Sequence, residues 1–333
     1  MLDGLDVLIT GGTGSFGQCF VGTVLERFRP GRLIVFSRDE LKQFQMRERF
    51  PEADYPSLRY FIGDVRDRER LYRAFDGVDV VVHAAAMKQV PACEYNPIEA
   101  IRTNVLGAAN IVDAAIDRGV QRTVALSSDK AANPVNLYGA TKLSADKLFI
   151  AANNYAGARD TRFSAVRYGN VIGSRGSVIP VFLKAREQGK IRVTDERMTR
   201  FWISLQQGVD FVIASLGRMR GGEIFVPKIP SMNIMDLAEA VAPGCAVERI
   251  GIRPGEKLHE VMVPEDDARN TVEYDDHYAI LPSYHQWDAA GWVEDGGRPV
   301  PDGFRYSSDR NEQWLSAEEL RAAAGLGGAG RDA

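Results

Sequence analysis

Tyr138 and Lys142 lie four residues apart in the segment YGATK, so a helix would carry both side chains on one face. A phenol near a lysine ammonium and an oxidised nicotinamide loses its proton more easily, because positive charge stabilises the phenolate and lowers the pKa. Such a tyrosine can take a hydroxyl proton while a hydride leaves the same carbon for the nicotinamide. The spacing alone is common, but here it opens the helix expected after the fifth buried segment, at the carboxyl edge where a cofactor should lie. We therefore predict an oxidising pair.

A second group of reactive side chains stands just before this pair, in the run Ser127-Ser128-Asp129-Lys130. A serine such as Ser128 can hydrogen-bond the reacting oxygen. Asp129 and Lys130 add an acid and a base that a simple alcohol oxidation does not need. They predict a further proton transfer, and the alternative is an ion pair in an exposed turn.

A glycine-rich loop, TGGTGSFG, follows the first apolar segment. Glycines allow the sharp turn, the close approach of a pyrophosphate and the packing of the next helix on the strand, while the helix start offers amides and partial positive charge. Gln18 replaces the lysine of a Walker loop, which excludes that alternative. The loop predicts a dinucleotide site made by Gly11, Thr13, Gly14, Ser15, Phe16 and Gly17.

The end of the second apolar segment indicates which dinucleotide is bound. An NAD site usually has an acidic residue here for the ribose hydroxyls. Ser37 and Arg38 stand there instead, and both can bind a 2′-phosphate, so we predict NADP rather than NAD. The alternative is that Arg38 is a surface charge and that Asp39 or Glu40 turns inward.

Two further segments are expected to line the cofactor. Asp64 and Val65 follow the third strand and would lie beside the adenine, unless Asp64 only caps a turn. Ala84 follows the fourth strand and offers a small side chain where a cofactor passes close to the backbone.

The elements that position these groups alternate between buried strands and amphipathic helices. Such repeated βα units predict an α/β fold with a doubly wound parallel Rossmann sheet, which binds ligands at the carboxyl ends of its strands. Strands are expected at 5–10, 32–37, 58–63, 78–84, 122–128 and 162–168, and helices at 15–28, 67–75, 97–116 and 138–155.

Beyond residue 170 the chain has shorter elements separated by Gly and Pro. We expect an NADP-binding domain over 1–170, to which about 197–225 return, and a smaller mixed α/β substrate domain over 171–320. A last helix is predicted after Ser316, with Glu319 completing a capping box. Residues 325–333 are expected to be a flexible tail.

Composition excludes several classes of function. The chain has 333 residues, a net charge of −4 and 45% hydrophobic residues, which indicates a globular protein without a basic field for nucleic acid. Three separated cysteines indicate a reducing compartment, and no apolar stretch predicts a membrane span or signal peptide, so a cytoplasmic protein is expected. The four histidines are scattered and predict no metal site, and Asn104 is expected to tie the sheet edge together.

The segments TGGTGSFG and YGATK resemble those of the extended short-chain dehydrogenase/reductase superfamily. Longer segments, ALSSDKAANPVNLYGATK, HAAAMKQVPACEYNP, RYGNVIGSRGSVIP, TRFW, GGEIFVPKIPS and GIRPGEKLHEVM, are similar to those of the soluble inverting UDP-N-acetylglucosamine 4,6-dehydratases of pseudaminic acid biosynthesis. The resemblance covers about 5–320 and weakens around 265–305.

This resemblance implies an activity. Tyr138 and Lys142 would oxidise carbon 4 of UDP-N-acetylglucosamine with a tightly bound NADP that is recycled in each turnover. Neutral Lys130 would take the carbon-5 proton, and protonated Asp129 would release the 6-hydroxyl as water. Return of the hydride to carbon 6 and inversion at carbon 5 would give a UDP-2-acetamido-2,6-dideoxy-4-keto-L-hexose. Related dehydratases that retain carbon 5 usually have Glu in the place of Lys130.

The resemblance also implies binding roles and assembly. Lys88 matches a lysine near cofactor and substrate, Val171 matches a nicotinamide neighbour, and the family commonly forms homo-oligomers. Substrate-binding positions are matched by Lys88, Asn170, Arg175, Gly176, Ser177, Val178, Arg253 and Glu256. The alternatives are a retaining dehydratase, a nucleotide-sugar 4-epimerase, which has no leaving group for Asp129 to protonate, and a non-catalytic NADP-binding sensor.

Overall fold

The computed structural model describes residues 1–174, 177–283, 292–293 and 295–326. A flexible tail was expected over 325–333, and residues 327–333 of it lie outside the described part of the chain. Within the described residues, none of the helices combines the length and apolar character needed to cross a lipid bilayer.

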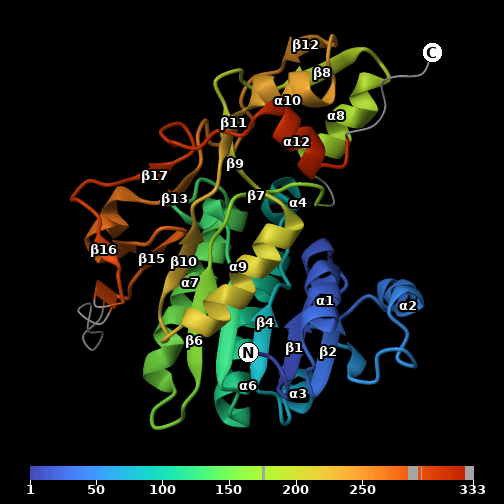
Figure 1. The fold of residues 1–333 in the computed structure, drawn as a ribbon, viewed down its shortest axis with the longest axis vertical. Helices are drawn as coiled ribbons and strands as arrows, with labels where there is room; N and C mark the ends of the chain where they lie inside the picture. The colour runs from blue at the N-terminus through green and yellow to red at the C-terminus, as the bar shows by residue number, and fades with distance from the viewer. Residues whose placement is uncertain (175–176, 284–291, 294, 327–333) are drawn as a thin grey trace.

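A large twisted sheet forms the centre of the molecule (Figure 1). Its strands, in spatial order, are β16 (Arg298–Pro299), β14 (Thr271–Glu273), β15 (His277–Ile280), β10 (Ile224–Pro227), β6 (Arg162–Val166), β5 (Arg122–Leu126), β4 (Val80–His83), β1 (Asp6–Thr10), β2 (Arg32–Ser37) and β3 (Leu58–Ile62).

The order β3-β2-β1-β4-β5-β6 is that of a doubly wound Rossmann sheet, and these strands and β10 are parallel. The predicted α/β fold and its six predicted strands are thus confirmed. Register aligns the carboxyl ends, because Thr10 pairs with His83 and His83 pairs with Ala125. Strands β14 to β16 extend the sheet in antiparallel pairings, which the sequence pattern did not indicate.

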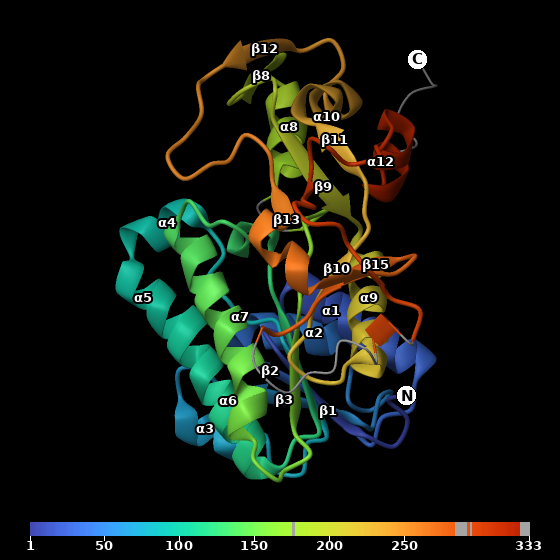
Figure 2. The same ribbon diagram turned by 90° about the vertical axis from the view of Figure 1, so that its left-hand side faces the viewer.

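Helices cover both faces of this sheet (Figure 2). Side chains alternate between the faces along each strand, so Val7 and Ile9 enter one core cluster and Leu8 enters the other. One face carries α1 (Ser15–Arg27) and α9 (Leu205–Arg218), and α2 (Glu40–Arg49) lies at the edge near them. The other face carries α3 (Arg68–Ala74), α4 (Val90–Tyr95), α5 (Pro97–Ile101), the π-helical turn η1 (Arg102–Leu106), α6 (Gly107–Arg118) and α7 (Leu137–Tyr155).

A smaller lobe stands over the carboxyl ends of the strands (Figure 1). It has its own core, in which Phe182, Trp202 and Leu237 are buried. Its elements are β7 (Asn170–Val171), β9 (Thr199–Ile203) and β11 (Ser231–Asn233) in one sheet, β8 (Lys190–Val193) with β12 (Ala246–Arg249), and the helices α8 (Val178–Arg186), α10 (Ile234–Val241) and α12 (Ala317–Ala323).

Between the lobe and the sheet, β13 (Val261–Val263) pairs with β17 (Tyr306–Ser307), and η3 (Glu265–Asn270) follows β13. Helix α12 begins with the predicted capping box between Ser316 and Glu319, and Leu320 enters the core of the lobe. The chain therefore passes more than once between sheet and lobe, with α9 and β10 returning to the sheet before α10 is formed.

Candidate active site

The glycine loop between β1 and α1 is shaped for close contact. Gly11 has a φ of +66°, and a Cβ there would lie 2.9 Å from the amide nitrogen of Ala85. A Cβ on Gly17 would collide with the backbone of Gly12, so the helix packs on the strand only with glycine at this position. Gly14 precedes α1 and has no side chain to cap it, which leaves the first amides to an anionic ligand. The loop fits a dinucleotide pyrophosphate.

The end of β2 presents one cation near the same edge. Ser37 is buried, and its hydroxyl accepts a hydrogen bond of 3.0 Å from Gln43 Nε2. The Arg38 side chain is 63% exposed and lies 3.7 Å from Asp64. Asp39 caps α2 by accepting a hydrogen bond from the amide of Lys42. If Asp39 turned inward to bind a ribose, its carboxylate would have to give up this helix cap.

Asp64 and Val65 have structural partners of their own. Asp64 Oδ1 accepts a hydrogen bond of 3.0 Å from the amide of Arg66, and its other oxygen lies 2.7 Å from the same guanidinium. Val65 is buried under α6, next to Gly107. Asp64 thus stabilises the turn after β3, which is the alternative that the sequence left open.

The loop after β4 is fixed to two helices by Asn104. Asn104 Oδ1 accepts a hydrogen bond of 2.8 Å from the amide of Met87, and Asn104 Nδ2 donates to the carbonyl oxygen of Met87 at 2.9 Å. The same Nδ2 donates to the hydroxyl of Thr141 in α7 at 3.0 Å. Ala84, which opens this loop, lies against Gly11, and Lys88 closes it. Asn104 was expected to tie the sheet edge together; its hydrogen bonds instead join the loop after β4 to the helix that carries Tyr138.

Asp129 and Lys130 form the turn η2 (Asp129–Ala131) after β5. Ser128 caps this turn by accepting from the amide of Lys130 at 3.2 Å, and its hydroxyl donates to Asp129 Oδ1 at 2.7 Å. Lys130 Nζ lies 3.0 and 3.2 Å from the two oxygens of Asp129. Asp129 is 1% exposed, so the pair is a buried ion pair and not the exposed turn of the alternative reading.

The protonation of this pair differs from the sequence-based expectation. Burial is the largest single influence and by itself raises the pKa of Asp129 and lowers that of Lys130. For Asp129 it is outweighed by the charge of Lys130 together with hydrogen bonds from Ser128 and Lys130, and for Lys130 by the charges of Asp129 and Glu260 together. The pKa of Asp129 is therefore lowered and that of Lys130 raised, and at rest they are carboxylate and ammonium. The expected neutral lysine and protonated aspartate arise if one proton moves across the hydrogen bond between them.

Tyr138 is held beside this pair by the first turn of α7. Asn136 caps the helix by accepting from the amide of Gly139 at 2.8 Å. A Cβ on Gly139 would collide with the carbonyl oxygen of Lys130, so the glycine of YGATK lets α7 approach η2. Tyr138 is buried, and its pKa is influenced by a hydrogen bond with Ser128 and by the charge of Lys130.

The pKa of Tyr138 also departs from expectation. Burial raises it to about 12, and the charge of Lys130 and the hydrogen bond with Ser128 offset this only in part. Lys142 Nζ donates to the carbonyl oxygen of Leu126 at 2.6 Å, and the cation that most offsets burial at Tyr138 is Lys130. Burial also lowers the pKa of Lys142. A lowered tyrosine pKa therefore requires the positive charge of the oxidised nicotinamide as well.

Three charged residues that the sequence analysis did not select complete the site. Glu260 Oε1 lies 3.6 Å from Lys130 Nζ and 3.7 Å from Arg200 Nε, and Oε2 lies 3.7 Å from Lys257 Nζ. Lys257 also donates to the carbonyl oxygen of Ala132 at 2.5 Å. These residues stand in the segments TRFW and RPGEKLHE, where charged residues are common, and only the fold brings them to η2.

Some of the residues matched to substrate binding lie around this centre. Asn170 Oδ1 is 3.5 Å from Lys130 Nζ, and Val171 follows it in β7. Ser177 and Val178 form the start of α8, whereas Arg175 and Gly176 lie outside the described residues.

The turn that holds Arg253 and Glu256 is attached to the start of α7. Arg253 and Glu256 approach each other to 3.8 Å, and the carbonyl oxygen of Gly255 accepts a hydrogen bond of 2.7 Å from Asn136. Gly255 has a φ of +79°, and a Cβ there would lie 3.0 Å from the Asn136 Cβ. The turn is therefore joined to the residue that caps the Tyr138 helix.

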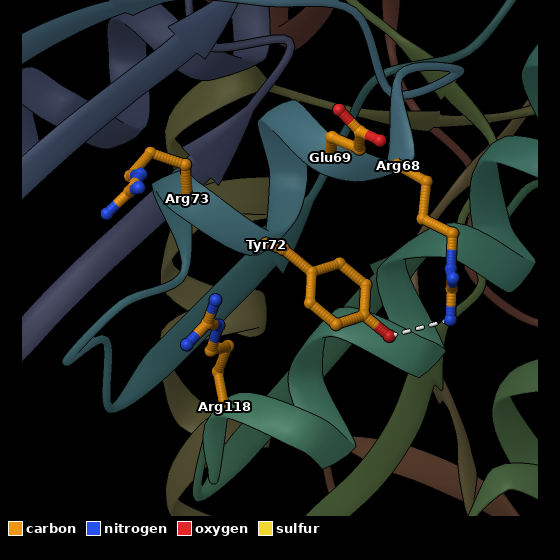
Figure 3. A pocket seen from close by; sticks show the side chains of 5 residues that line it. All are labelled: Arg68, Glu69, Tyr72, Arg73 and Arg118. Atoms are coloured by element: carbon orange, nitrogen blue, oxygen red, sulfur yellow. Dashed lines mark hydrogen bonds between the residues drawn. The ribbon is translucent and has the colours of Figure 1, made fainter.

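A pocket at α3 and the end of α6 is separate from this site (Figure 3). Two of its cations have acidic partners, since Arg68 lies 3.5 Å from Asp113 and donates to the Tyr72 hydroxyl, and Arg118 lies 3.6 Å from Asp76. Tyr72 in turn donates to Asp117. The lining residues are Arg68, Glu69, Tyr72, Arg73 and Arg118.

The described residues include no group of three or more His, Cys, Asp or Glu that could hold a metal ion. His83 ends β4 inside the core, where Nδ1 lies 2.8 Å from the Thr10 hydroxyl.

The chain is similar to known proteins in sequence and in structure. The UDP-N-acetylglucosamine 4,6-dehydratase (inverting) of Campylobacter jejuni is 56% identical over 96% of this chain and 97% of its own. The UDP-glucose 4-epimerase of Rickettsia canadensis is 41% identical over 95% of this chain and 94% of its own. The X-ray structure of Pen from Bacillus thuringiensis has a TM-score of 0.86 and 38% identity, covering 96% of this chain and 98% of that one.

The family model described as polysaccharide biosynthesis protein matches residues 7–282, which is most of the chain. The sheet order, the glycine loop and the Tyr138–Lys142 pair are those of the extended short-chain dehydrogenase/reductase fold. On these grounds the chain belongs to the polysaccharide biosynthesis protein family of the extended short-chain dehydrogenases/reductases.

Proposed function

We propose that the protein is an inverting UDP-N-acetylglucosamine 4,6-dehydratase. The observation that carries the proposal is the buried Asp129–Lys130 pair, which stands beside Tyr138 at the carboxyl edge of the sheet. The 56% identity to the Campylobacter jejuni dehydratase over nearly the whole chain supports the substrate and the stereochemistry.

A nicotinamide dinucleotide is held by the loop from Gly11 to Gly17, with its pyrophosphate at the start of α1. When bound, it accepts a hydride from the substrate and returns it within the same turnover. Arg38 is the exposed cation at the end of β2 that can pair with a 2′-phosphate, which favours NADP. Val171 and Lys88 would complete its surroundings on the nicotinamide side.

Tyr138 removes the proton of the 4-hydroxyl during oxidation. Its hydrogen bond with Ser128 orients the phenol, and the charge of Lys130 offsets part of the effect of burial on its pKa; the positive charge of a bound oxidised nicotinamide would lower this pKa further. Lys142 is anchored to the carbonyl oxygen of Leu126 and keeps its charge on the same helical face as Tyr138. The resulting 4-ketone acidifies the proton on carbon 5.

Asp129 and Lys130 then carry out the elimination. Transfer of a proton from Lys130 to Asp129 gives an amine and a carboxylic acid without changing the net charge. The amine takes the carbon-5 proton, the bond between carbon 6 and its hydroxyl breaks, and the acid protonates the departing hydroxyl as water. The pair returns to ammonium and carboxylate. A proton added later to the other face of carbon 5 inverts it.

The proposal is tested by incubating purified protein with UDP-N-acetylglucosamine and a catalytic amount of NADP⁺, followed by mass spectrometry. The expected product is lighter than the substrate by one water, without any external reductant or oxidant. A product of unchanged mass that is the carbon-4 epimer would indicate the activity of the Rickettsia relative instead. Unchanged substrate with bound NADP would contradict both activities and favour a sensor.

A further inference from the structure

Glu260 lies among the charged groups of the site but has no role in the chemistry proposed above. It directly precedes β13, is 3% exposed, and its carboxylate meets cations from three segments of the chain. Among the described residues, Oε2 accepts no hydrogen bond. A buried carboxylate oxygen without a hydrogen bond is costly, and here charge alone compensates it.

The backbone around Glu260 is fixed, so the carboxylate has a defined place. Its amide donates to Ser308 Oγ at 2.9 Å, and its carbonyl oxygen accepts from the Ser308 amide at 2.8 Å. Ser308 Oγ also lies 2.7 Å from the Thr199 hydroxyl, which joins this segment to β9. From the other side, Arg167 donates to the carbonyl oxygen of Met262 at 2.9 Å.

The three cations around Glu260 are not equivalent. The Lys130 side chain is 26% exposed, whereas those of Arg200 and Lys257 are 14% and 12% exposed. Arg200 and Lys257 are tied to backbone carbonyls, since Arg200 donates to Leu258 at 3.0 Å and Lys257 donates to Ala132 at 2.5 Å. Lys130 is therefore the cation that a substrate can reach, and Glu260 and the other two lie behind it.

Glu260 also changes the charge balance around the reacting pair. The facing charged groups are Asp129 and Lys130 of η2, Arg200 of β9, and Lys257, while the titratable Tyr138 of α7 faces Lys130. With Glu260 this cluster has three cations and two anions, and without it three cations and one anion. The added negative charge holds the Lys130 proton more tightly and so opposes its transfer to Asp129.

We propose that Glu260 is a positioning residue of the dehydration step, which holds the Lys130 amine between Asp129 and Asn170 and controls how readily this amine gives its proton to Asp129. This inference rests on the proposed dehydratase function. Within the described residues Glu260 pairs with Lys130, Arg200 and Lys257 and makes no ion pair or hydrogen bond with Tyr138 or Lys142, so its main effect is expected on the elimination rather than on the first step.

The test is Glu260→Gln, which keeps the shape and removes the charge. Its matched control is Glu248→Gln, because Glu248 of β12 is also shared between two cations, Lys190 and Arg192, but lies on the surface. In Glu260→Gln the Lys130 amine is no longer held between Asp129 and Asn170, and we expect this loss of position to outweigh the easier loss of its proton. The expected result is a kcat about tenfold or more lower, a KM changed less than about threefold, and reduced cofactor that accumulates in a single turnover. The acidic limb of the pH profile of kcat should move to lower pH, because Lys130 loses its proton more easily.

Glu260→Asp separates charge from position. It restores the negative charge with a shorter side chain, so the acidic limb should return to the wild-type pH while kcat is only partly restored. A Glu260→Gln protein with wild-type kcat and pH profile would overturn the inference, even though the wild type makes the dehydrated product. If Glu260→Gln does not fold, Glu260→Asp decides: reduced kcat at unchanged KM supports the inference, and wild-type kcat contradicts it. A wild type that makes no dehydrated product refutes the proposed function itself.

Discussion

Lys130 Nζ lies 3.0 Å from Asp129 Oδ1, and the carboxylate of this pair is almost entirely buried. Because the two groups are so close, one proton can move from Lys130 to Asp129. This single transfer produces both the base and the acid of the elimination. Neither residue has to exchange a proton with solvent before the substrate reacts. The pair starts the elimination as ammonium and carboxylate and returns to that state when water leaves.

Removal of Lys130 should separate substrate binding from chemistry. In Lys130→Ala the carbon-5 proton has no base, so we expect formation of the 6-deoxy product to fall by about a thousandfold or more. The dissociation constant of UDP-N-acetylglucosamine, measured by calorimetry, should change less than about threefold. Lys147→Ala, at an exposed position of the same α7 region, is the control and should keep wild-type turnover. Near-wild-type turnover of Lys130→Ala would rule out its role as the base.

Gly17 should be required for cofactor binding. In Gly17→Ala the new Cβ meets the backbone of Gly12, so α1 must move away from β1. We expect loss of bound nucleotide and a lower midpoint of thermal unfolding. Gly208→Ala is the matched control, since Gly208 lies in α9 with open space around its Cβ position, and alanine favours a helix by up to about 1 kcal/mol. Equal nucleotide content in the two variants would contradict the account of the loop.

Arg38 should determine the preference between the two dinucleotides. Without its guanidinium, the 2′-phosphate loses a charge-assisted partner, whereas the ribose hydroxyls of NAD lose little. Arg38→Ala should weaken NADP⁺ binding about tenfold or more and NAD⁺ binding less than about threefold, as measured by fluorescence titration. Equal effects on both dinucleotides would show that Arg38 does not contact the 2′-phosphate.

His83 should make the protein sensitive to mild acid. Burial, followed by the charge of Lys142, lowers the pKa of His83 to about 3, while in the unfolded chain it is near 6.5. Between these values only the unfolded state takes up the proton, so stability falls as the pH decreases through this window, by up to about 1.4 kcal/mol per pH unit. Above the unfolded pKa the histidine has no such effect.

His83→Asn removes this titration and keeps an acceptor for Thr10. The free energy of unfolding, measured with urea at about pH 7.5 and about pH 5, should fall by about 2 kcal/mol more in the wild type than in the variant. The same pH dependence in both proteins would mean that His83 is not kept neutral by the fold.

The sequence was sufficient for those parts of the molecule that depend on local pattern. Continuous apolar runs predicted the six parallel strands, and Gly11, Gly14 and Gly17 marked the loop because only glycine fits such a turn. Ser316 and Glu319 predicted the start of the last helix, since a capping box needs only four consecutive residues.

The features that depend on distant contacts could not be predicted in this way. Glu260 and Lys130 are 130 positions apart, and they meet only because β13 is attached beside η2. The resting protonation of Asp129 and Lys130 could not be read from the sequence, because it depends on the short distance between their charges. The antiparallel strands β14 to β16 are short and lie where the pattern of βα units has ended.

The most direct test of the account is proton NMR of UDP-N-acetylglucosamine incubated with the protein and trace NADP⁺ in deuterated water. The account predicts a 6-deoxy-4-keto product with a 6-methyl signal, deuterium at carbon 5 and inverted configuration at that carbon. A 6-deoxy product with retained configuration would contradict the inverting chemistry assigned to Lys130. The absence of a methyl signal, with only a carbon-4 epimer or unchanged substrate, would contradict the elimination by Asp129 and Lys130 altogether.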